Sequence, residues 1–200
     1  MPGAAFFAHL GFFVCQDFLP ADLRLQLLSE MRRGLSHDAG IARASTVIVD
    51  RAVRRTRRVD VIGDTARTIE SRLEGMKGTF EQHFMVSLDS LQSPQYLIYR
   101  RGDSFTPHRD TAGGDFLDYV RERKISVVLF LNSQSDRRKR DTFSGGDLVF
   151  YGLIGDSRLS SYGYPLSAEA GTLIAFSSEI LHEVTPVTHG VRYSVVSWYC

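Results

Sequence analysis

The sequence predicts a mainly β protein in which a few helices brace an antiparallel sandwich or barrel. After Ser93, short runs of β-branched and aromatic residues alternate with turn-rich segments, without helical periodicity between them. Before that point, two stretches place apolar residues at steps of three or four, which is the spacing of a helix. We treat residues 1–200 as one domain, in which residues 1–90 support a β core formed by residues 91–200.

The chain opens with an apolar stretch, AAFFAHLGFFV, at residues 4–14. A signal peptide would carry a basic residue before this stretch and a small-residue cleavage site after it, and the sequence has neither. The stretch is also well short of the roughly 20 residues that span a bilayer. We therefore expect a buried N-terminal strand, in a cytoplasmic protein without membrane contact.

Two helices are expected next. The first begins at Pro20, which suits the first turn of a helix because the N–H that proline lacks is not needed there. Its apolar stripe consists of Leu23, Leu27, Leu28 and Met31. The second is one long helix with Asp60 or Asp64 as its N-cap. Its stripe consists of Ile62, Ala66, Ile69, Leu73, Met76, Phe80 and Phe84.

The strands of the β core are predicted from short apolar runs bounded by turns such as Gly145-Gly146. These runs are Tyr96–Arg100, Ile125–Leu131, Leu148–Tyr151, Leu173–Phe176 and Tyr193–Tyr199. A further segment, Phe105–Asp110, is strand-like but more polar.

Composition excludes several classes of protein. Lys and Arg total 24 and Asp and Glu total 23, whereas a dedicated nucleic-acid-binding protein would show a large basic excess. Only Cys15 and Cys200 are present, so neither a disulfide scaffold nor a zinc-finger array is expected, and a reducing compartment is favoured. These observations disfavour nucleic acid as a partner and leave the oligomeric state open.

The polar segment ends in His108-Arg109-Asp110. Side chains two residues apart on a strand point to the same face, so this HxD pair offers an imidazole and a carboxylate side by side. Alone the pair is a weak signal, because a histidine is more often a structural group. A third ligand must come from elsewhere, and His182 is the best candidate. Two histidines and one carboxylate on one face of an octahedron leave three positions open on Fe(II).

Arg192 follows His182 across a turn-like stretch at residues 185–190, so we expect the chain to double back and bring Arg192 near the metal. Arg192 and Ser194 share one face of the returning strand. A guanidinium with a hydroxyl beside it suits the far carboxylate of a dicarboxylate. The alternative is a surface arginine on an edge strand. Because the strand is apolar on both sides, a buried arginine without an anion would be costly there.

A dense motif fills residues 99–110, YRRGDSFTPHRD, and five other segments follow the pattern of one family. These segments are residues 18–20, 123–132, 143–148 with an F-x-G-G-x-L turn, 171–176, and 182–184 together with Arg192. The motif resembles the Y-x-x-G-D-x-F-x-P-H-x-D signature of the prolyl 4-hydroxylase-like branch of the Fe(II)- and 2-oxoglutarate-dependent dioxygenases. The six segments occur in the family's order, which makes the resemblance specific.

The resemblance implies a double-stranded β-helix, or jelly-roll, core in which His108, Asp110 and His182 hold Fe(2+). It implies 2-oxoglutarate as a cosubstrate, with its distal carboxylate on Arg192 and hydrogen bonds from Tyr99 and Ser194. O2 is the other cosubstrate and ascorbate an accessory reductant. The implied reaction is hydroxylation of a C–H bond. Because halogenating relatives lose the carboxylate that Asp110 supplies, halogenation is not expected.

Two basic segments, residues 51–58 and 137–140, allow two interpretations. A charge run is usually a solvated surface. The alternative is a rim that steers an acidic peptide, a tRNA or a carboxylate-bearing substrate. The resemblance implies that residues 44–59 border the substrate entrance, which makes this segment the stronger candidate.

Three hypotheses of function follow. The first is a dioxygenase that hydroxylates a prolyl or related residue in a peptide or protein. The second keeps the reaction but makes the substrate a free amino acid or another small metabolite. The third is a non-catalytic jelly-roll binding module, which the intact set of candidate site residues disfavours.

Overall fold

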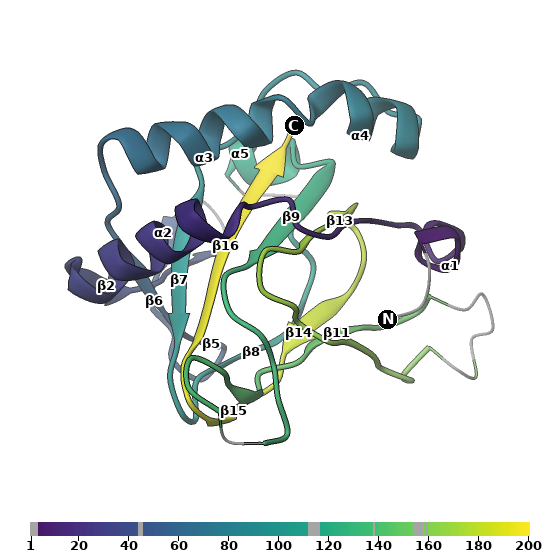
Figure 1. Cartoon of the computed structure of the whole chain (residues 1–200). Coiled ribbons are helices and arrows are strands. Elements are labelled where there is room, and N and C mark those ends of the chain that lie inside the picture. Colours follow the sequence, from purple (N-terminus) through teal and green to yellow (C-terminus); the bar gives the residue numbers. More distant parts are fainter. Residues whose placement is uncertain (1–3, 44–45, 112–116, 138, 154–157, 159) are drawn as a thin grey trace.

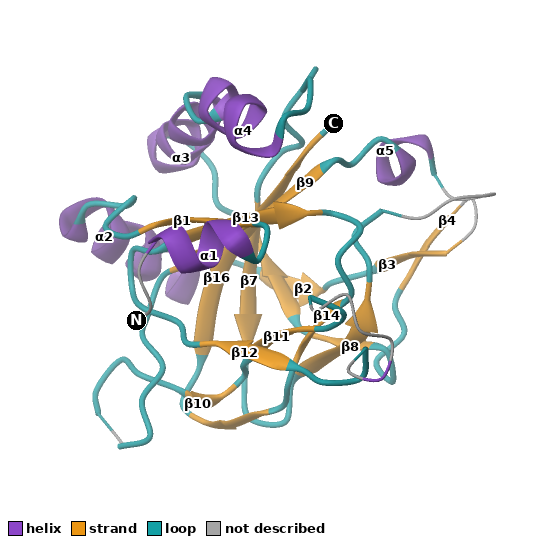
Figure 2. Ribbon diagram, turned by 90° about the vertical axis from the view of Figure 1, so that its right-hand side faces the viewer, coloured by secondary structure: helices purple, strands orange, loops and turns teal. Residues whose placement is uncertain are grey.

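The computed structural model describes residues 4–43, 46–111, 117–137, 139–153, 158 and 160–200. Arg138 of the second basic segment and residues 44–45 of the expected substrate entrance lie outside this part of the chain. Two antiparallel sheets face each other, and helices pack on the outer side of the larger one (Figures 1 and 2). The predicted mainly β class with bracing helices is confirmed. Every described helix is too short or too polar to cross a bilayer.

The larger sheet has seven strands in the order β1-β13-β9-β16-β7-β6-β2. Their bounds are Phe12–Cys15 for β1, Leu173–Ser177 for β13, Ile125–Phe130 for β9, Arg192–Tyr199 for β16, Gln95–Tyr99 for β7, Arg57–Val59 for β6 and Ser36–Asp38 for β2. The four strands β7, β9, β13 and β16 were predicted from the sequence within a residue or two. In chain order β16 comes last, yet it lies between β9 and β7.

The smaller sheet has five strands in the order β12-β11-β14-β8-β5. Their bounds are Tyr164–Leu166, Leu148–Phe150, His182–Val184, Ser104–His108 and Arg54–Arg55. Two ribbons complete the fold, β3 (Ile41–Arg43) with β4 (Thr46–Ile48), and β10 (Ser144–Gly145) with β15 (Val187–His189). The stretch at 185–190, expected to be a turn, therefore contains strand β15.

Two hydrophobic clusters lie on the two faces of the larger sheet. On β9, Ile125, Val127 and Leu129 pack toward the helices, whereas Val128 and Phe130 pack toward the smaller sheet. All six residues of β9 are buried, which explains why this strand is apolar throughout instead of alternating.

Three helices cover the outer face of the larger sheet, α2 (Ala21–Arg33), α3 (Asp64–Glu74) and α4 (Lys77–Phe84), as Figure 1 shows. The single long helix predicted over residues 62–84 is wrong. Gly75 ends α3, and the chain starts again at α4 after Met76. Glycine has roughly 1 kcal/mol less helix propensity than alanine, so the break falls at the weakest point of the periodic run.

The ends of that helical region also differ from the prediction. Ile62 is 86% exposed and precedes the first helix. The N-cap is Gly63, with no side-chain hydrogen bond, so neither Asp60 nor Asp64 caps the helix. A short helix, α5 (Asp118–Arg121), also interrupts the region after Ser93 where only strands were expected.

The predicted N-terminal strand over residues 4–14 is half helical. Helix α1 (Ala4–His9) comes first, and Gly11, with φ of +80°, turns the chain into β1. Glycine adopts this left-handed conformation without the strain that a side chain would cause. Phe12 is 1% exposed and packs on Phe150 and Phe176, whereas the other three residues of β1 are only partly buried.

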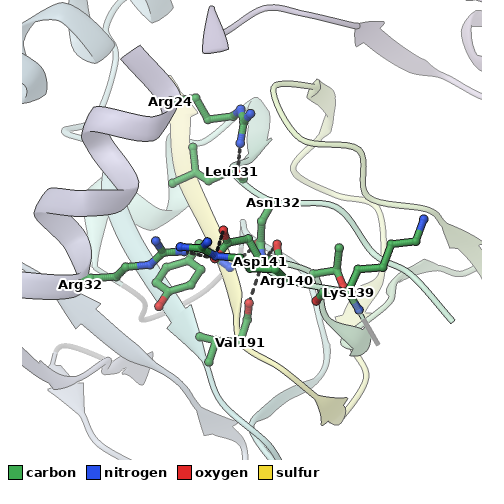
Figure 3. A network of polar contacts seen from close by, with 10 residues as sticks. Arg24, Arg32, Leu131, Asn132, Lys139, Arg140, Asp141 and Val191 are labelled. Carbon is green, nitrogen blue, oxygen red and sulfur yellow. Dashed lines mark hydrogen bonds and ion pairs between the residues drawn. The ribbon is translucent and has the colours of Figure 1, made fainter. Parts of the chain in front are cut away.

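A polar network surrounds Asn132, in the loop after β9 (Figure 3). The side chain is 3% exposed. Its Nδ2 donates to the carbonyl oxygens of Asp141 at 3.1 Å and Val191 at 2.8 Å. Its Oδ1 accepts from the backbone N–H of Tyr193 at 2.9 Å. One buried amide thus connects the loop to the start of β16, with donors and acceptor all used.

Two arginines of helix α2 also contact the same loop. Arg32 pairs with the Asp141 carboxylate at 2.7 Å, and Arg24 donates to the carbonyl oxygen of Leu131 at 3.0 Å (Figure 3). Asp141, near the end of the segment at residues 133–142, is therefore anchored to helix α2.

Candidate metal centre

His108 and His182 lie opposite each other on neighbouring strands. His108 is the last residue of β8 and His182 the first of β14, and the antiparallel pairing places them in register. The centroids of their rings are 4.3 Å apart. Strand pairing thus brings together two histidines that are far apart in the sequence.

Asp110 lies beyond the end of β8, and the prediction of a strand through this residue is wrong. The N–H groups of Asp110 and Thr111 both donate to the carbonyl oxygen of Ser178, at 3.0 and 3.2 Å, and this turns the chain. Asp110 Oδ1 lies 3.6 Å from Nε2 of His108, and Oδ2 lies 3.5 Å from Nε2 of His182. The expected proximity is present, although a turn and not the strand pleat produces it.

Backbone carbonyls fix the tautomer of both histidines. Nδ1 of His108 lies 2.8 Å from the Thr106 carbonyl oxygen, and Nδ1 of His182 lies 2.9 Å from that of Ile180. A carbonyl only accepts, so each Nδ1 carries the proton and each Nε2 keeps its lone pair. Both lone pairs are on the ring edge that faces Asp110, which is the arrangement of metal-binding histidines.

The protonation states match those of metal ligands. Burial lowers the pKa of His182 to about 4, against the opposing effect of Asp110, so its imidazole is neutral at pH 7. Burial would raise the pKa of Asp110, but the positive charge that His182 carries below its own pKa, together with His108 and the Ser126 hydroxyl, brings it below its usual range. At pH 7 the neutral imidazole of His182 therefore faces the carboxylate of Asp110.

These three residues fit a small divalent cation. One ligand atom from each lies within 4.8 Å of the others, and no other group of three such residues is found in the described part of the chain. Ligand bonds of roughly 2.0–2.2 Å require the atoms to converge in this way. The donor set of two nitrogens and one oxygen is that of Fe(II) oxygenases, with positions left open.

Arg192 is almost fully buried, at 1% exposure, although no described carboxylate pairs with it. Nη1 donates to the Ser194 hydroxyl at 3.0 Å, and the guanidinium lies over the rings of Tyr99 and Phe130, at 5.0 and 5.3 Å. Nε has no hydrogen-bond partner. Burial lowers the pKa of Arg192, although the group stays charged. A buried cation in this state is a site for an anion.

Tyr99 and Ser194, the predicted neighbours of Arg192, both lie beside it, but only Tyr99 lines the cavity. Tyr99 stands directly across from Arg192 in the β7–β16 pair and lines the same cavity. Ser194 does not line that cavity, and its hydroxyl contacts Arg192. Ser194 is therefore placed to orient the guanidinium.

The space for Arg192 depends on Gly146, whose φ is +61°. A Cβ on this residue would lie 2.8 Å from Cγ2 of Val187 and 3.2 Å from Cδ of Arg192. The second glycine of the F-x-G-G-x-L turn thus lets the turn pack against the arginine.

One cavity of about 1140 Å³ contains all of these groups. It lies between the two sheets and is lined by His108, Asp110, His182, Arg192 and Tyr99, and by residues of the β3–β4 ribbon and of β5. From the segment at 44–59 it receives Val47, Val49, Val53, Arg54 and Arg58, whereas no described residue of 133–142 reaches it. From the sequence, residues 44–59 were the stronger candidate for the border of the substrate entrance.

The residues with unsatisfied buried nitrogens gather at this cavity. Within the described chain, three buried side-chain atoms lack a hydrogen-bond partner: Nε of Arg54, Nε of Arg192 and Nε1 of Trp198. All three residues line the cavity. Because an unpaired buried donor costs free energy, such a concentration points to ligands that complete the hydrogen bonds.

Sequence reasoning missed several residues of the site. The Ser126 hydroxyl contacts the Ser178 hydroxyl at 2.9 Å and helps to lower the pKa of Asp110. A lone hydroxyl inside the apolar run of β9 was the available signal. Phe105 stacks on His108 with ring centroids 3.5 Å apart. Arg54 was one of several arginines in a basic segment, and nothing local marked it as the buried one.

Comparisons with known proteins agree with this geometry. Residues 94–200 match the family model of the 2OG-Fe(II) oxygenase superfamily. A PKHD-type hydroxylase of Shewanella sp. strain MR-7 is 31% identical over 105 residues, which is 52% of this chain and 41% of that protein. The chain thus matches about two fifths of the length of this relative.

Two solved structures share the fold over nearly the whole chain. A Pseudomonas putida prolyl-4-hydroxylase has a TM-score of 0.70 at 22% identity, covering 98% of this chain and 97% of its own. A Trichoplax adhaerens prolyl hydroxylase, in complex with a hypoxia inducible factor peptide fragment, has a TM-score of 0.74 at 19% identity, covering 98% and 88%. These similarities establish the jelly-roll core that the sequence implied. Since the family model spans more than half of the chain, including every candidate site residue, the protein belongs to the 2OG-Fe(II) oxygenase superfamily.

Proposed function

We propose that this protein is an Fe(II)- and 2-oxoglutarate-dependent dioxygenase that hydroxylates a C–H bond of a prolyl or related residue in a peptide or protein. The observation that carries the proposal is the convergence of His108, Asp110 and His182 in one cavity with the unpaired guanidinium of Arg192. Such a site provides both a metal position and an anion position, as this oxygenase chemistry requires.

His108, Asp110 and His182 would hold Fe(2+). The carbonyls of Thr106 and Ile180 keep Nε2 of each histidine free for the ion, and Ser126 orients the carboxylate. Bound Fe(2+) and 2-oxoglutarate supply the activation of O2 and the oxidation of the substrate C–H bond.

Arg192 would bind the distal carboxylate of 2-oxoglutarate. Ser194 holds Nη1 in place, Tyr99 supplies a phenol on the same wall, and the rings of Tyr99 and Phe130 exclude water around the ion pair. A charge-assisted hydrogen bond in a dry pocket is about twice as strong as a neutral one. Arg192, Ser194 and Tyr99 would thereby hold the cosubstrate by its distal carboxylate.

The peptide hypothesis is supported by the cavity wall. Val47 and Val49, on and beside the β3–β4 ribbon, line the cavity and are still 57% and 55% exposed. Exposed apolar side chains at the rim of a cavity can contact a chain that extends beyond it. The named similarity to PKHD-type and prolyl hydroxylases points the same way.

The second candidate is a hydroxylase of a free amino acid or another small metabolite. The arginines of the cavity favour it, because a small acid would bring its own carboxylate to a buried cation. We further propose that ascorbate acts as an accessory reductant, that the protein is cytoplasmic, and that residues 1–200 act as one domain.

Anaerobic titration with Fe(II) and 2-oxoglutarate tests the proposal. The expected result is a metal-to-ligand charge-transfer band that saturates with one equivalent of each and disappears with a chelator. Succinate formation is then measured with peptide and amino-acid panels, with and without ascorbate. A protein that binds neither the metal nor 2-oxoglutarate would contradict the proposed function.

A further inference from the structure

Arg54 is a second buried arginine without an acid. It is 8% exposed, and no described carboxylate forms an ion pair with it. Its Nη1 donates to the carbonyl oxygen of Gly40 at 2.9 Å, whereas its Nε has no partner. Burial of an uncompensated charge is unfavourable, so this arrangement needs an explanation.

Arg54 repeats the pattern of Arg192. Each has a guanidinium with one neutral hydrogen bond and an unpaired Nε, and each lies against an aromatic ring of the same cavity. The proposed function explains Arg192 through the distal carboxylate of 2-oxoglutarate. It leaves Arg54 without a partner, and 2-oxoglutarate has no carboxylate left for it once the other end is at the metal.

The position of Arg54 is next to the metal centre. It pairs with Phe105 across strands β5 and β8, and its guanidinium lies 4.9 Å above the Phe105 ring. The ring of His108 also stacks on Phe105, with centroids 3.5 Å apart. The guanidinium and a proposed metal ligand thus contact the same aromatic ring, and a substrate bound at Arg54 would lie near the metal.

Positive charge surrounds this position. The described residues that line the cavity include six arginines, Arg54, Arg58, Arg109, Arg121, Arg123 and Arg192, and three acids, Asp38, Asp110 and Glu179. Arg123 is held by Gln92 and by the carbonyl oxygen of Asp110, and its guanidinium lies 3.7 Å from the Trp198 ring. A cavity with this excess of cations favours an anion over a neutral or basic ligand.

We propose that Arg54 binds a carboxylate of the substrate, so that the enzyme acts on a carboxylate-bearing molecule. The inference rests on the proposed function for the identity of the reaction, but the anion site itself depends only on Arg54 and the cavity. The carboxylate is either that of a free amino acid or that of an acidic residue beside the target in a peptide. Both supply the two oxygens that a guanidinium binds.

Binding of paired probes tests the proposal. The chain has one tryptophan, Trp198, in the cavity wall, so its fluorescence reports occupancy. The protein is titrated in excess Mn(II) and 2-oxoglutarate with L-proline and L-prolinamide. A second pair is a capped pentapeptide with glutamate beside a central proline, and the same peptide with glutamine. We expect the acid of one pair to bind about 10- to 100-fold more tightly than its amide.

Three variants assign this preference to Arg54. Arg54→Gln is expected to bring the ratio of acid to amide affinity to about 1, and Arg54→Lys to keep part of it because the charge remains. Arg55→Gln is the matched control, since Arg55 is the exposed neighbour on β5 and does not line the cavity. The pair that shows the preference identifies a free acid or an acidic peptide as its source.

The outcomes are separable from those of the proposed function. A ratio near 1 for both pairs in the wild type, or a preference that survives Arg54→Gln, overturns the anion site. The charge-transfer band of Fe(II) with 2-oxoglutarate is recorded for every variant, and an intact band shows that Arg54→Gln is folded. An Arg54-dependent preference without any such band would support the anion site and contradict the oxygenase.

Discussion

The cavity and the Asn132 network bury polar groups in opposite ways. Around Asn132, both amide donors and the acceptor have backbone partners. In the cavity, buried nitrogens of Arg54, Arg192 and Trp198 have none. An unsatisfied buried group costs about 1–3 kcal/mol, whereas a satisfied one is neutral or stabilising. We infer that the buried amide of Asn132 contributes to stability. The unpaired buried nitrogens of the cavity are instead available to bind ligands.

The largest effect is expected at the metal centre. In His182→Ala, one of the two imidazole ligands is lost, so Fe(II) binding and succinate formation should fall to the level of chelator-treated protein. His9→Ala, which changes an exposed residue of helix α1, is the matched control and should retain full turnover. Retained succinate formation in His182→Ala would contradict the ligand assignment.

The next largest effect is expected in the hydrogen-bond network of Asn132. Asn132→Ala leaves the Tyr193 N–H and the carbonyls of Asp141 and Val191 without their partner. The free energy of unfolding, measured by urea denaturation, should fall by about 2–4 kcal/mol, with the affinity for 2-oxoglutarate unchanged in the folded protein. If the free energy of unfolding stays within about 0.5 kcal/mol of the wild-type value, the claim that Asn132 contributes to stability is contradicted.

Substitution of Arg192 should have the opposite effects, with stability retained and the affinity for 2-oxoglutarate reduced. Arg192→Met removes a buried charge that no described acid balances, so the free energy of unfolding should stay constant or increase. The dissociation constant of 2-oxoglutarate, from the anaerobic titration, should increase about 10- to 100-fold. Arg192→Lys keeps the charge and should fall between. A variant with a lower free energy of unfolding and an unchanged affinity for 2-oxoglutarate would show that Arg192, like Asn132, contributes to stability and not to ligand binding.

The smallest effect is expected at the edge of the network. Arg32 and Asp141 form an ion pair whose side chains are 42% and 49% exposed. Because exposed pairs contribute little, Arg32→Ala should lower the free energy of unfolding by no more than about 1 kcal/mol. A loss as large as that of Asn132→Ala would show that the ion pair, and not the amide, holds the loop.

The sequence allowed the principal site residues to be predicted because their chemistry is local or periodic. Strand geometry makes Arg192 and Ser194 adjacent, because they are two residues apart on β16. The HxD spacing indicated His108 and Asp110, although a turn after β8 brings these two together. Arg54 could not be found in this way. It lies among other arginines, and its burial results from pairing of β5 with β8, a contact between distant parts of the chain.

The helical errors have a similar origin. The period through residues 62–84 was recognised, but the low helix propensity of glycine at position 75 was not taken as the end of a helix. At the N-terminus, the apolar content predicted a buried strand, but of the described side chains only Phe7 and Phe12 are buried, Phe6 is 45% exposed, and Gly11 separates a helix from a strand. Periodicity predicts which side chains are buried better than it predicts where an element ends.

The position of β16 has a consequence for how the protein acquires its structure. This strand leaves the ribosome after the other six of its sheet, yet it is the one that joins β9 to β7. Until it inserts, both neighbours present open edges, and Arg192, at its first residue, has no cavity to enter. Such long-range pairing slows folding. Because Arg192 belongs to this strand, the proposed anion site forms only once β16 has joined the sheet.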